Sequence, residues 1–205
     1  MNRDSSESNR ISFGKFMELF ITDDVRSVAR RMFVTNSIDS LLAYSGAVLG
    51  NLFAGNENPV EYLATGIGLA LSVSLLSNFL ATFFVEEAER RIELREVSKH
   101  LLKDISSSLL GKAPRVVALY VAFWSALGAL LFPLIASIPF LFSVYGLIDV
   151  LVAVVVSIAI VVVTLFALGY YLGSLIGRDK VVWGIKLALI GAILLILSII
   201  REITL

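Results

Sequence analysis

The chain has 205 residues, of which 58% are hydrophobic, and it carries 17 acidic and 17 basic side chains. Soluble domains contain about 45–50% apolar residues, so this composition, with a mean hydropathy of +0.88, indicates an integral membrane protein. The balanced charge points away from a nucleic-acid partner, and the absence of Cys with a single His excludes disulfides and thiolate or imidazole clusters, so a bound metal would depend on carboxylates.

The first 32 residues are predicted to lie outside the membrane. Residues 1–10 are polar and are typical of a disordered tail, and no apolar core of a signal peptide follows them directly. Between residues 11 and 32, apolar and charged side chains alternate, which predicts one or two amphipathic turns on the membrane face.

The first predicted span covers residues 33–54, and Asp39 is the only charged residue in it. On a helix Asp39 shares one face with Ala43, Gly46 and Gly50, and faces of small residues are packing faces in membranes. We therefore expect the acid to face another helix or a wet cavity, where an intramembrane carboxylate indicates an ion or proton path. The alternative is a carboxylate that caps a helix or pairs with Arg30 or Arg31.

A turn at residues 55–59 separates this helix from the second predicted span, residues 60–85. Small and polar residues follow helical spacing along the second span, so the faces of spans one and two could meet each other or their copies in a homodimer. The face of the second span consists of Gly66, Ala70, Ser74, Ser77, Asn78 and Ala81.

A charged segment, residues 86–105, contains no Gly or Pro, so the second helix can continue through it into the cytoplasm. Its acids fall within an arc of roughly 80° on a helix, whereas most of its basic residues lie on the far side. Clustered carboxylates favour a divalent cation, and a solvated helix with Glu to Arg pairs is the alternative. The aligned residues are Glu86, Glu89, Glu93, Glu96, His100 and Asp104.

Three further spans complete the prediction, at residues 116–138, 147–175 and 181–200. Pro133 is expected to kink the third span, and a turn from Pro139 through Gly146 is expected to end it. The predicted fold is thus all-α, a polytopic membrane protein with five transmembrane helices over residues 33–205. Most Lys and Arg residues lie on the N-terminal side, which predicts a cytoplasmic N-terminus and an outside C-terminus in a cell membrane.

These pieces together resemble the vacuolar iron transporter family. Residues 30–40, with Arg30, Arg31 and the run Asn36-Ser37-Ile38-Asp39-Ser40, look like the family's first-span motif. The glutamate-rich continuation of span two, the run from Ser125 to Leu134 and the run from Gly184 to Ala192 look like its later parts. The resemblance implies a homodimer of five-span chains that moves ferrous iron or manganese out of the cytoplasm, with Asp39 as the transport acid.

The chain departs from the family pattern in three respects. Ser40 stands where the motif has a glycine, and the second span lacks the family's methionine ligand, so Asn78, Ser74 or Ser77 would have to serve. The family's cytoplasmic metal-binding domain is also reduced here to about 28 residues, with fewer candidate ligands.

We therefore expect a transporter of divalent cations that exchanges them for protons, with no resident cofactor and no enzymatic activity. No Ser-His-acid set and no glycine-rich phosphate loop is present in the sequence. The alternative is a non-transporting membrane protein whose charged helix recruits a protein partner. The residues expected to bind metal are Asp39, Glu86, Glu89, Glu93, Glu96 and His100, and those expected along the path are Asp39, Ser74, Asn78, Gly46 and Gly50.

Overall fold

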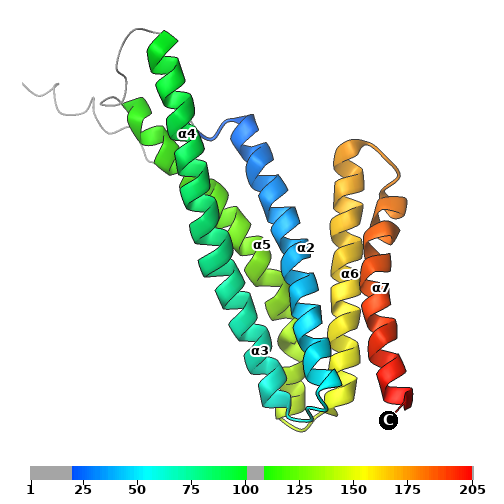
Figure 1. The fold of residues 1–205 in the computed structure, drawn as a ribbon. Helices are drawn as coiled ribbons and strands as arrows, with labels where there is room; N and C mark the ends of the chain where they lie inside the picture. Colours follow the sequence, from blue (N-terminus) through cyan, green and yellow to red (C-terminus); the bar gives the residue numbers. More distant parts are fainter. Residues whose placement is uncertain (1–19, 101–108, 205) are drawn as a thin grey trace, which may run out of the picture.

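The computed structural model describes residues 20–100 and 109–204, and every regular element in them is helical (Figure 1). The predicted tail, residues 1–10, and residues 101–105 of the predicted charged helix lie outside the described residues. The elements are α2 (Asp23–Phe53), α3 (Pro59–Leu71), the π-helix η1 (Ser72–Leu80), α4 (Ala81–His100), the 3-10 turn η2 (Leu109–Lys112), α5 (Ala113–Val144), α6 (Val150–Ile176) and α7 (Lys180–Thr204).

Three continuous helices in the described residues are long and apolar enough to cross a membrane: Pro59–His100, Ala113–Val144 and Val150–Ile176. The first of them combines α3, η1 and α4. The prediction of an all-α fold is therefore confirmed, and three of the five predicted spans have a helix of the length and composition that a membrane span requires.

Helix α2 begins ten residues before the predicted span. Thr22 caps it, since its hydroxyl oxygen accepts from the Val25 amide, and Asp23 and Asp24 in the first turn complement the helix dipole. Val25 and Ala29 are buried, in a small cluster that includes Val117 and Val121 of α5. Residues 23–32 therefore belong to the same helix as the predicted first span, and for residues 23–32 the prediction of separate surface turns is wrong.

The helix from Pro59 to His100 confirms that the second span continues into the charged segment as far as the described residues reach. Asn58 caps its start, because the Asn58 side-chain oxygen accepts from the Val60 amide at 3.1 Å, and Pro59 occupies the first turn. The nine residues of η1 have π-helical geometry. Helix periodicity did not predict this change, which occurs often at functional sites.

Helix α5 continues past both of its prolines. Pro133 and Pro139 lie inside the helix, which ends at Val144, and Gly146 then adopts a positive φ of 71° in the following turn. The predicted turn from Pro139 to Gly146 is therefore wrong over its first six residues. Prolines are tolerated in membrane-spanning helices because neighbouring helices can compensate for the lost backbone hydrogen bond.

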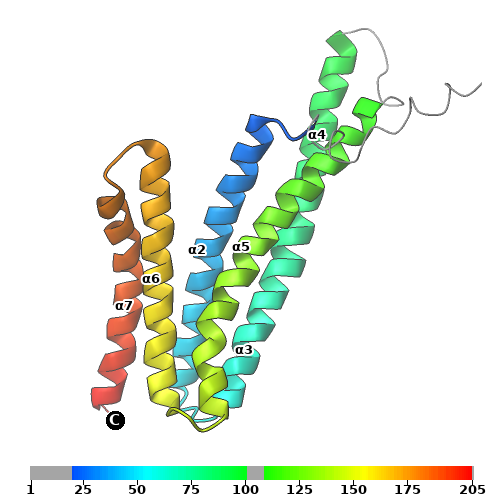
Figure 2. The ribbon, with the colours of Figure 1, turned by 180° about the vertical axis from the view of Figure 1, so that it is seen from behind.

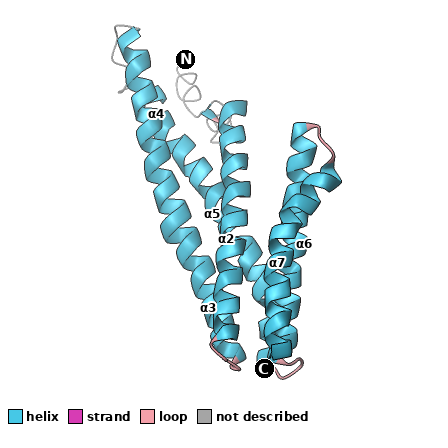
Figure 3. Cartoon of the chain, turned by 45° about the vertical axis from the view of Figure 1, so that its right-hand side comes forward, coloured by secondary structure: helices cyan, strands magenta, loops and turns pink. Residues whose placement is uncertain are grey.

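The helices form two groups that meet at one end of the molecule. Helices α2, α5 and the long α3–α4 helix pack together, whereas α6 and α7 form a pair that diverges from α2 toward the other end (Figures 1 and 2). Two connecting turns, after α2 and after α5, lie at the end where the groups meet (Figure 3). We call the other end, where α2 and α7 begin, the basic end.

The main core lies where the two groups meet. Tyr62 and Phe140 stack there with their ring centroids 5.0 Å apart, and Leu41, Ile158 and Leu165 are fully or almost fully buried. The α6–α7 pair is held by close approach at Gly169, since a Cβ at this position would collide with the Trp183 carbonyl. This is the packing that small residues permit between membrane helices.

Candidate functional site

Asp39 lies on an exposed face of α2. Thr35, Ala43, Gly46 and Gly50 are exposed along the same side of the helix, and we call these five residues the outer face. A Cβ added to Gly46 or Gly50 would meet nothing within 4 Å. The predicted common face of Asp39, Ala43, Gly46 and Gly50 is thus present, but it is exposed and does not pack on another helix among the described residues.

The Asp39 carboxylate has no ion pair and no hydrogen bond with the described residues, so the alternative in which it pairs with Arg30 or Arg31 is not observed. It also lies inside α2 and does not cap the helix. An unpaired carboxylate on a helix among apolar spans is costly unless something covers it.

The small face of the second span, in contrast, packs inside the chain. Gly66 and Ala70 are buried, and a Cβ on Gly66 would collide with Ser137 and Tyr44. The Ser74 hydroxyl donates to the Ala126 carbonyl of α5 at 3.0 Å. The faces of spans one and two therefore do not meet, and this part of the second face is not free to form a dimer, because α5 already covers it.

The predicted path residues Ser74 and Asn78 both belong to η1, where they differ in exposure. Ser74 is buried and its hydroxyl is satisfied by α5, whereas Asn78 is half-buried and its side-chain amide makes no hydrogen bond with the described residues. The Asn78 carbonyl accepts from the Ser125 hydroxyl at 3.4 Å. Of the two predicted neutral ligands, only Asn78 has a side chain that forms no hydrogen bond with the described residues.

A polar cluster that the sequence analysis did not single out joins three helices at this level. The Asn36 amide of α2 donates to the Ser125 hydroxyl of α5, and Thr82 of α4 lies 3.0 Å from the same oxygen. Thr82 and Ser125 each have apolar neighbours in the sequence, whereas Asn36 lies between Thr35 and Ser37, so the signal in the sequence was a polar side chain within a predicted span.

The acids of α4 do not form a metal site in the described residues, where no group of three His, Asp or Glu side chains converges. Arg90 lies among them instead. Its guanidinium contacts Glu86 and Glu93, each at 3.0 Å, and Asp24 of α2 at 3.8 Å. The Glu86 side chain is only 8% exposed. The observed network of charges within the chain thus corresponds to the alternative of Glu to Arg pairs for Glu86 and Glu93.

Arg90 is the cation at the centre of this network. Burial lowers its pKa, but the hydrogen bonds and charges of Glu93 and Glu86 outweigh this effect and leave the pKa of Arg90 above its usual value. A buried carboxylate needs such a partner, since leaving a buried charge unpaired is strongly destabilising.

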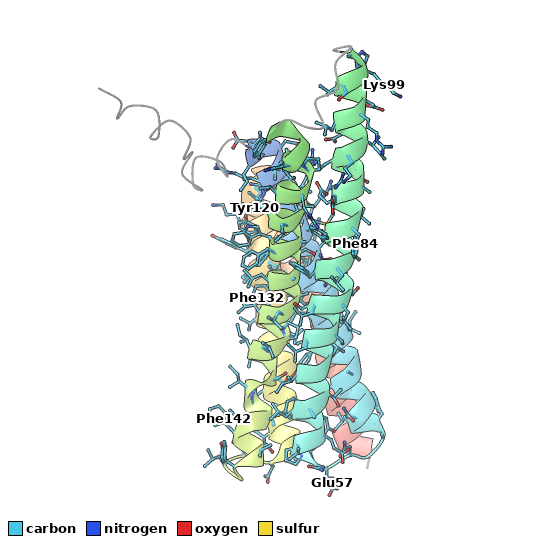
Figure 4. The ribbon with its side chains drawn as sticks, turned by 90° about the vertical axis from the view of Figure 1, so that its left-hand side faces the viewer. Glu57, Phe84, Lys99, Tyr120, Phe132 and Phe142 are labelled. Carbon is cyan, nitrogen blue, oxygen red and sulfur yellow. The ribbon has the colours of Figure 1, made fainter. Side chains whose placement is uncertain are left out.

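The remaining predicted ligands of α4, Glu89, Glu96 and His100, are exposed, and in the described residues they form no metal-binding group with Asp39. Figure 4 shows α4 extending beyond the rest of the bundle up to Lys99. Asp24, which contacts Arg90, precedes Asp39 by about four turns of α2, or roughly 22 Å of helix rise. The structure therefore separates the α4 acids from Asp39.

Comparison with known proteins gives one distant relative. The chain is 27% identical over 160 residues to the uncharacterized protein MJ0645 of Methanocaldococcus jannaschii. The aligned region covers 77% of this chain and 80% of the relative. No family model and no solved structure matches the chain. The resemblance to vacuolar iron transporters stays a prediction. The described residues are all-helical, with three helices that could span a membrane, and the chain is similar over most of its length to an archaeal protein.

Proposed function

We propose that the chain is a divalent metal cation transporter, for ferrous iron or manganese, that functions as a homodimer with Asp39 in the ion path. The observation that carries the proposal is the outer face of α2, where an unpaired carboxylate lies among small residues in a predicted span. Such a charge costs about 2.5–3.5 kcal/mol at the centre of a membrane helix. A second copy of the chain would cover Asp39, and protons or a cation bound there would neutralise its charge and so remove this cost.

In a two-fold dimer each residue near the axis faces its own copy. Packing of two outer faces brings two Asp39 carboxylates toward each other, and Gly46 and Gly50 allow close approach of the helices. Two facing carboxylates repel each other unless protons or a divalent cation neutralise them. Exchange between protons and the cation at this pair is the proposed transport step, and oxygen ligands suit ferrous iron and manganese.

The other parts of the proposal follow from the distribution of charge. Helices α2 and α7 serve as two further spans beside the three apolar helices. The basic end faces the cytoplasm, and Glu89, Glu96 and His100 at the exposed tip of α4 attract cations from that side. The half-buried Asn78 amide is the candidate neutral ligand within the membrane.

Uptake of ferrous iron and manganese into proteoliposomes, with and without a pH gradient, tests the proposal. Asp39→Asn is expected to abolish uptake, and Asp149→Asn is the matched control, because Asp149 is an exposed acid at the start of α6, away from the outer face. Both variants should keep the thermal unfolding midpoint of the unaltered protein. Full uptake by Asp39→Asn, or no uptake of either metal by the unaltered protein, would contradict the proposal.

A second candidate function is supported by the extension of α4 beyond the bundle (Figure 1). Ile92 and Val97 are 56% and 48% exposed on this charged helix, and exposed apolar residues of this kind can dock a protein partner. This function predicts that the divalent metals do not change the unfolding temperature, and that reversing the charges of Glu93 and Glu96 disturbs a complex.

A further inference from the structure

The cleft between α2 and α6 at the basic end contains two cavities that share one arginine. The larger, of about 350 Å³, is lined by Arg26, Arg30, Phe33, Tyr120, Trp124 and Tyr171. The smaller, of about 210 Å³, is lined by Arg30, Arg31, Val34, Ile38, Leu172 and Leu175. Both lie where the α6–α7 pair diverges from the rest of the bundle (Figures 1 and 3).

Among the described residues, no acidic side chain lines either cavity. Arg30 and Arg31 form no ion pair with the described residues. Among these residues Arg26 pairs only with Asp23, at 3.6 Å, and the Asp23 side chain is fully exposed. Such an exposed pair is weak. A cleft with three arginines and no internal counter-charge favours an anion, and the guanidinium fork suits a phosphate.

Below the arginines the walls are apolar. In the larger cavity Phe33 packs edge-on against Trp124, with their centroids 6.1 Å apart, and Tyr120 packs against the other side of Trp124. In the smaller cavity Val34 and Ile38 of α2 continue along the helix toward the apolar span. A free phosphate ion would use only the arginines, whereas an amphiphile with an acyl chain would also use these walls.

The level of the cleft along the bundle agrees with a membrane surface. Arg26 and Arg30 are one turn apart near the start of α2, and the apolar stretch begins at Phe33. Tyr and Trp residues gather at membrane interfaces, and both tryptophans of the chain, Trp124 and Trp183, lie in the halves of their helices nearer the basic end.

We propose that this cleft binds an anionic phospholipid, with its phosphate at Arg26 and Arg30 and an acyl chain against Phe33 and Trp124. Basic pockets between membrane helices are known to take anionic headgroups. The bound lipid fills the space between α2 and α6 at the end where these helices do not pack on each other. The four residues assigned to the lipid do not belong to the outer face, and Thr35 of the outer face lines only the smaller cavity, so lipid binding can be tested separately from metal transport.

Quenching of Trp124 by brominated lipids tests the site directly. Trp183→Phe leaves Trp124 as the single tryptophan of the full chain. The protein is reconstituted in phosphatidylcholine with a minor fraction of brominated phosphatidylglycerol, and in a parallel sample with the same fraction of brominated phosphatidylcholine. We expect stronger quenching by the anionic lipid, because a lipid bound in the cleft quenches Trp124 more than random contact with lipid of the bilayer does.

In this background, the double variant Arg26→Gln and Arg30→Gln should weaken phosphatidylglycerol binding roughly 30-fold, about fivefold for each arginine. Arg95→Gln is the control, because it removes one positive charge from an exposed position on α4, outside both cavities. Added inorganic phosphate should leave the quenching unchanged. Equal quenching by both lipids, quenching that persists in the double variant, or displacement of the lipid by inorganic phosphate would each overturn the proposal.

Discussion

The two faces of α2 differ both in their residues and in what they contact. On the inner face Leu41, Tyr44 and Val48 are fully or almost fully buried, and the hydroxyl of Ser45 donates to the Leu41 carbonyl of its own helix at 2.8 Å. On the outer face Asp39 is exposed and unpaired. A serine in a membrane helix can satisfy its hydroxyl locally, but a carboxylate cannot, because the helix offers it no free donor. The outer face therefore carries a charged group that has no partner among the described residues.

Some small residues elsewhere in the chain contact other helices of the same chain, as the residues of the inner face of α2 do. A Cβ on Gly128 of α5 would collide with the Phe33 carbonyl and the Ser37 hydroxyl of α2, whereas Gly46 and Gly50 have open space around them. Gly128 thus allows two helices of one chain to approach closely, whereas Gly46 and Gly50 leave room for a partner. Three sets of variants test this difference.

The largest effect is expected for Gly128→Leu, at the inner face. The new side chain would meet backbone atoms of α2 that cannot move aside, so we expect a loss of about 3 kcal/mol or more in the free energy of unfolding. Gly68→Leu is the control, because Gly68 is exposed on α3 and has no atom near its Cβ position. Thermal unfolding in detergent measures both, and equal midpoints would show that α2 and α5 do not pack as described.

A smaller effect is expected for Tyr44→Phe, on the same inner face. The Tyr44 hydroxyl lies 2.8 Å from the Ser157 oxygen, and Ser157 donates to the Ala136 carbonyl, so one buried hydrogen bond between α2 and α6 is lost. The expected cost is about 0.5–1.5 kcal/mol. Tyr145→Phe, at a tyrosine that is 74% exposed, should leave the unfolding midpoint unchanged. A larger shift for Tyr145→Phe than for Tyr44→Phe would contradict the assigned contact.

The smallest effect on unfolding is expected for the double variant Gly46→Leu and Gly50→Leu, on the outer face. Both positions have open space, so the free energy of unfolding of one chain should change by less than about 0.5 kcal/mol. Self-association in detergent, measured by analytical ultracentrifugation, should be lost, because bulky residues keep two outer faces apart. Gly68→Leu should associate like the unaltered protein. Unchanged association of the double variant would mean that the dimer, if present, uses another surface.

The sequence predicted the elements of the fold better than their contacts. Apolar runs of membrane length and the turn at Asn58 and Pro59 placed the helices within a few residues, because these signals are local. Two boundaries were wrong where neighbouring helices overrode the local signal: α2 begins early because Val25 and Ala29 pack beside α5, and α5 continues through Pro139. The π-helical stretch that contains Ser74 and Asn78 left no signal in the periodicity.

For the candidate site, the common face of Asp39, Ala43, Gly46 and Gly50 could be predicted, since helical spacing alone fixes which residues share a face. The pairing of Glu86 with Arg90 was expected as the alternative to metal binding, since i, i+4 spacing places them side by side. The contacts of Arg90 with Glu93 and with Asp24 were not predicted, and the contact with Asp24 depends on how α2 lies beside α4. The arginine cavities were missed as well, since they depend on the distance between α2 and α6.

The sequence by itself determined that this is an all-helical membrane protein with one acid on a face of small residues, because length, hydropathy and helical period are properties of each segment alone. Only the tertiary structure decided that this face points outward, that α5 covers the small face of the second span, and that three arginines line an open cleft. These are relations between helices, and they follow from how the helices pack on one another.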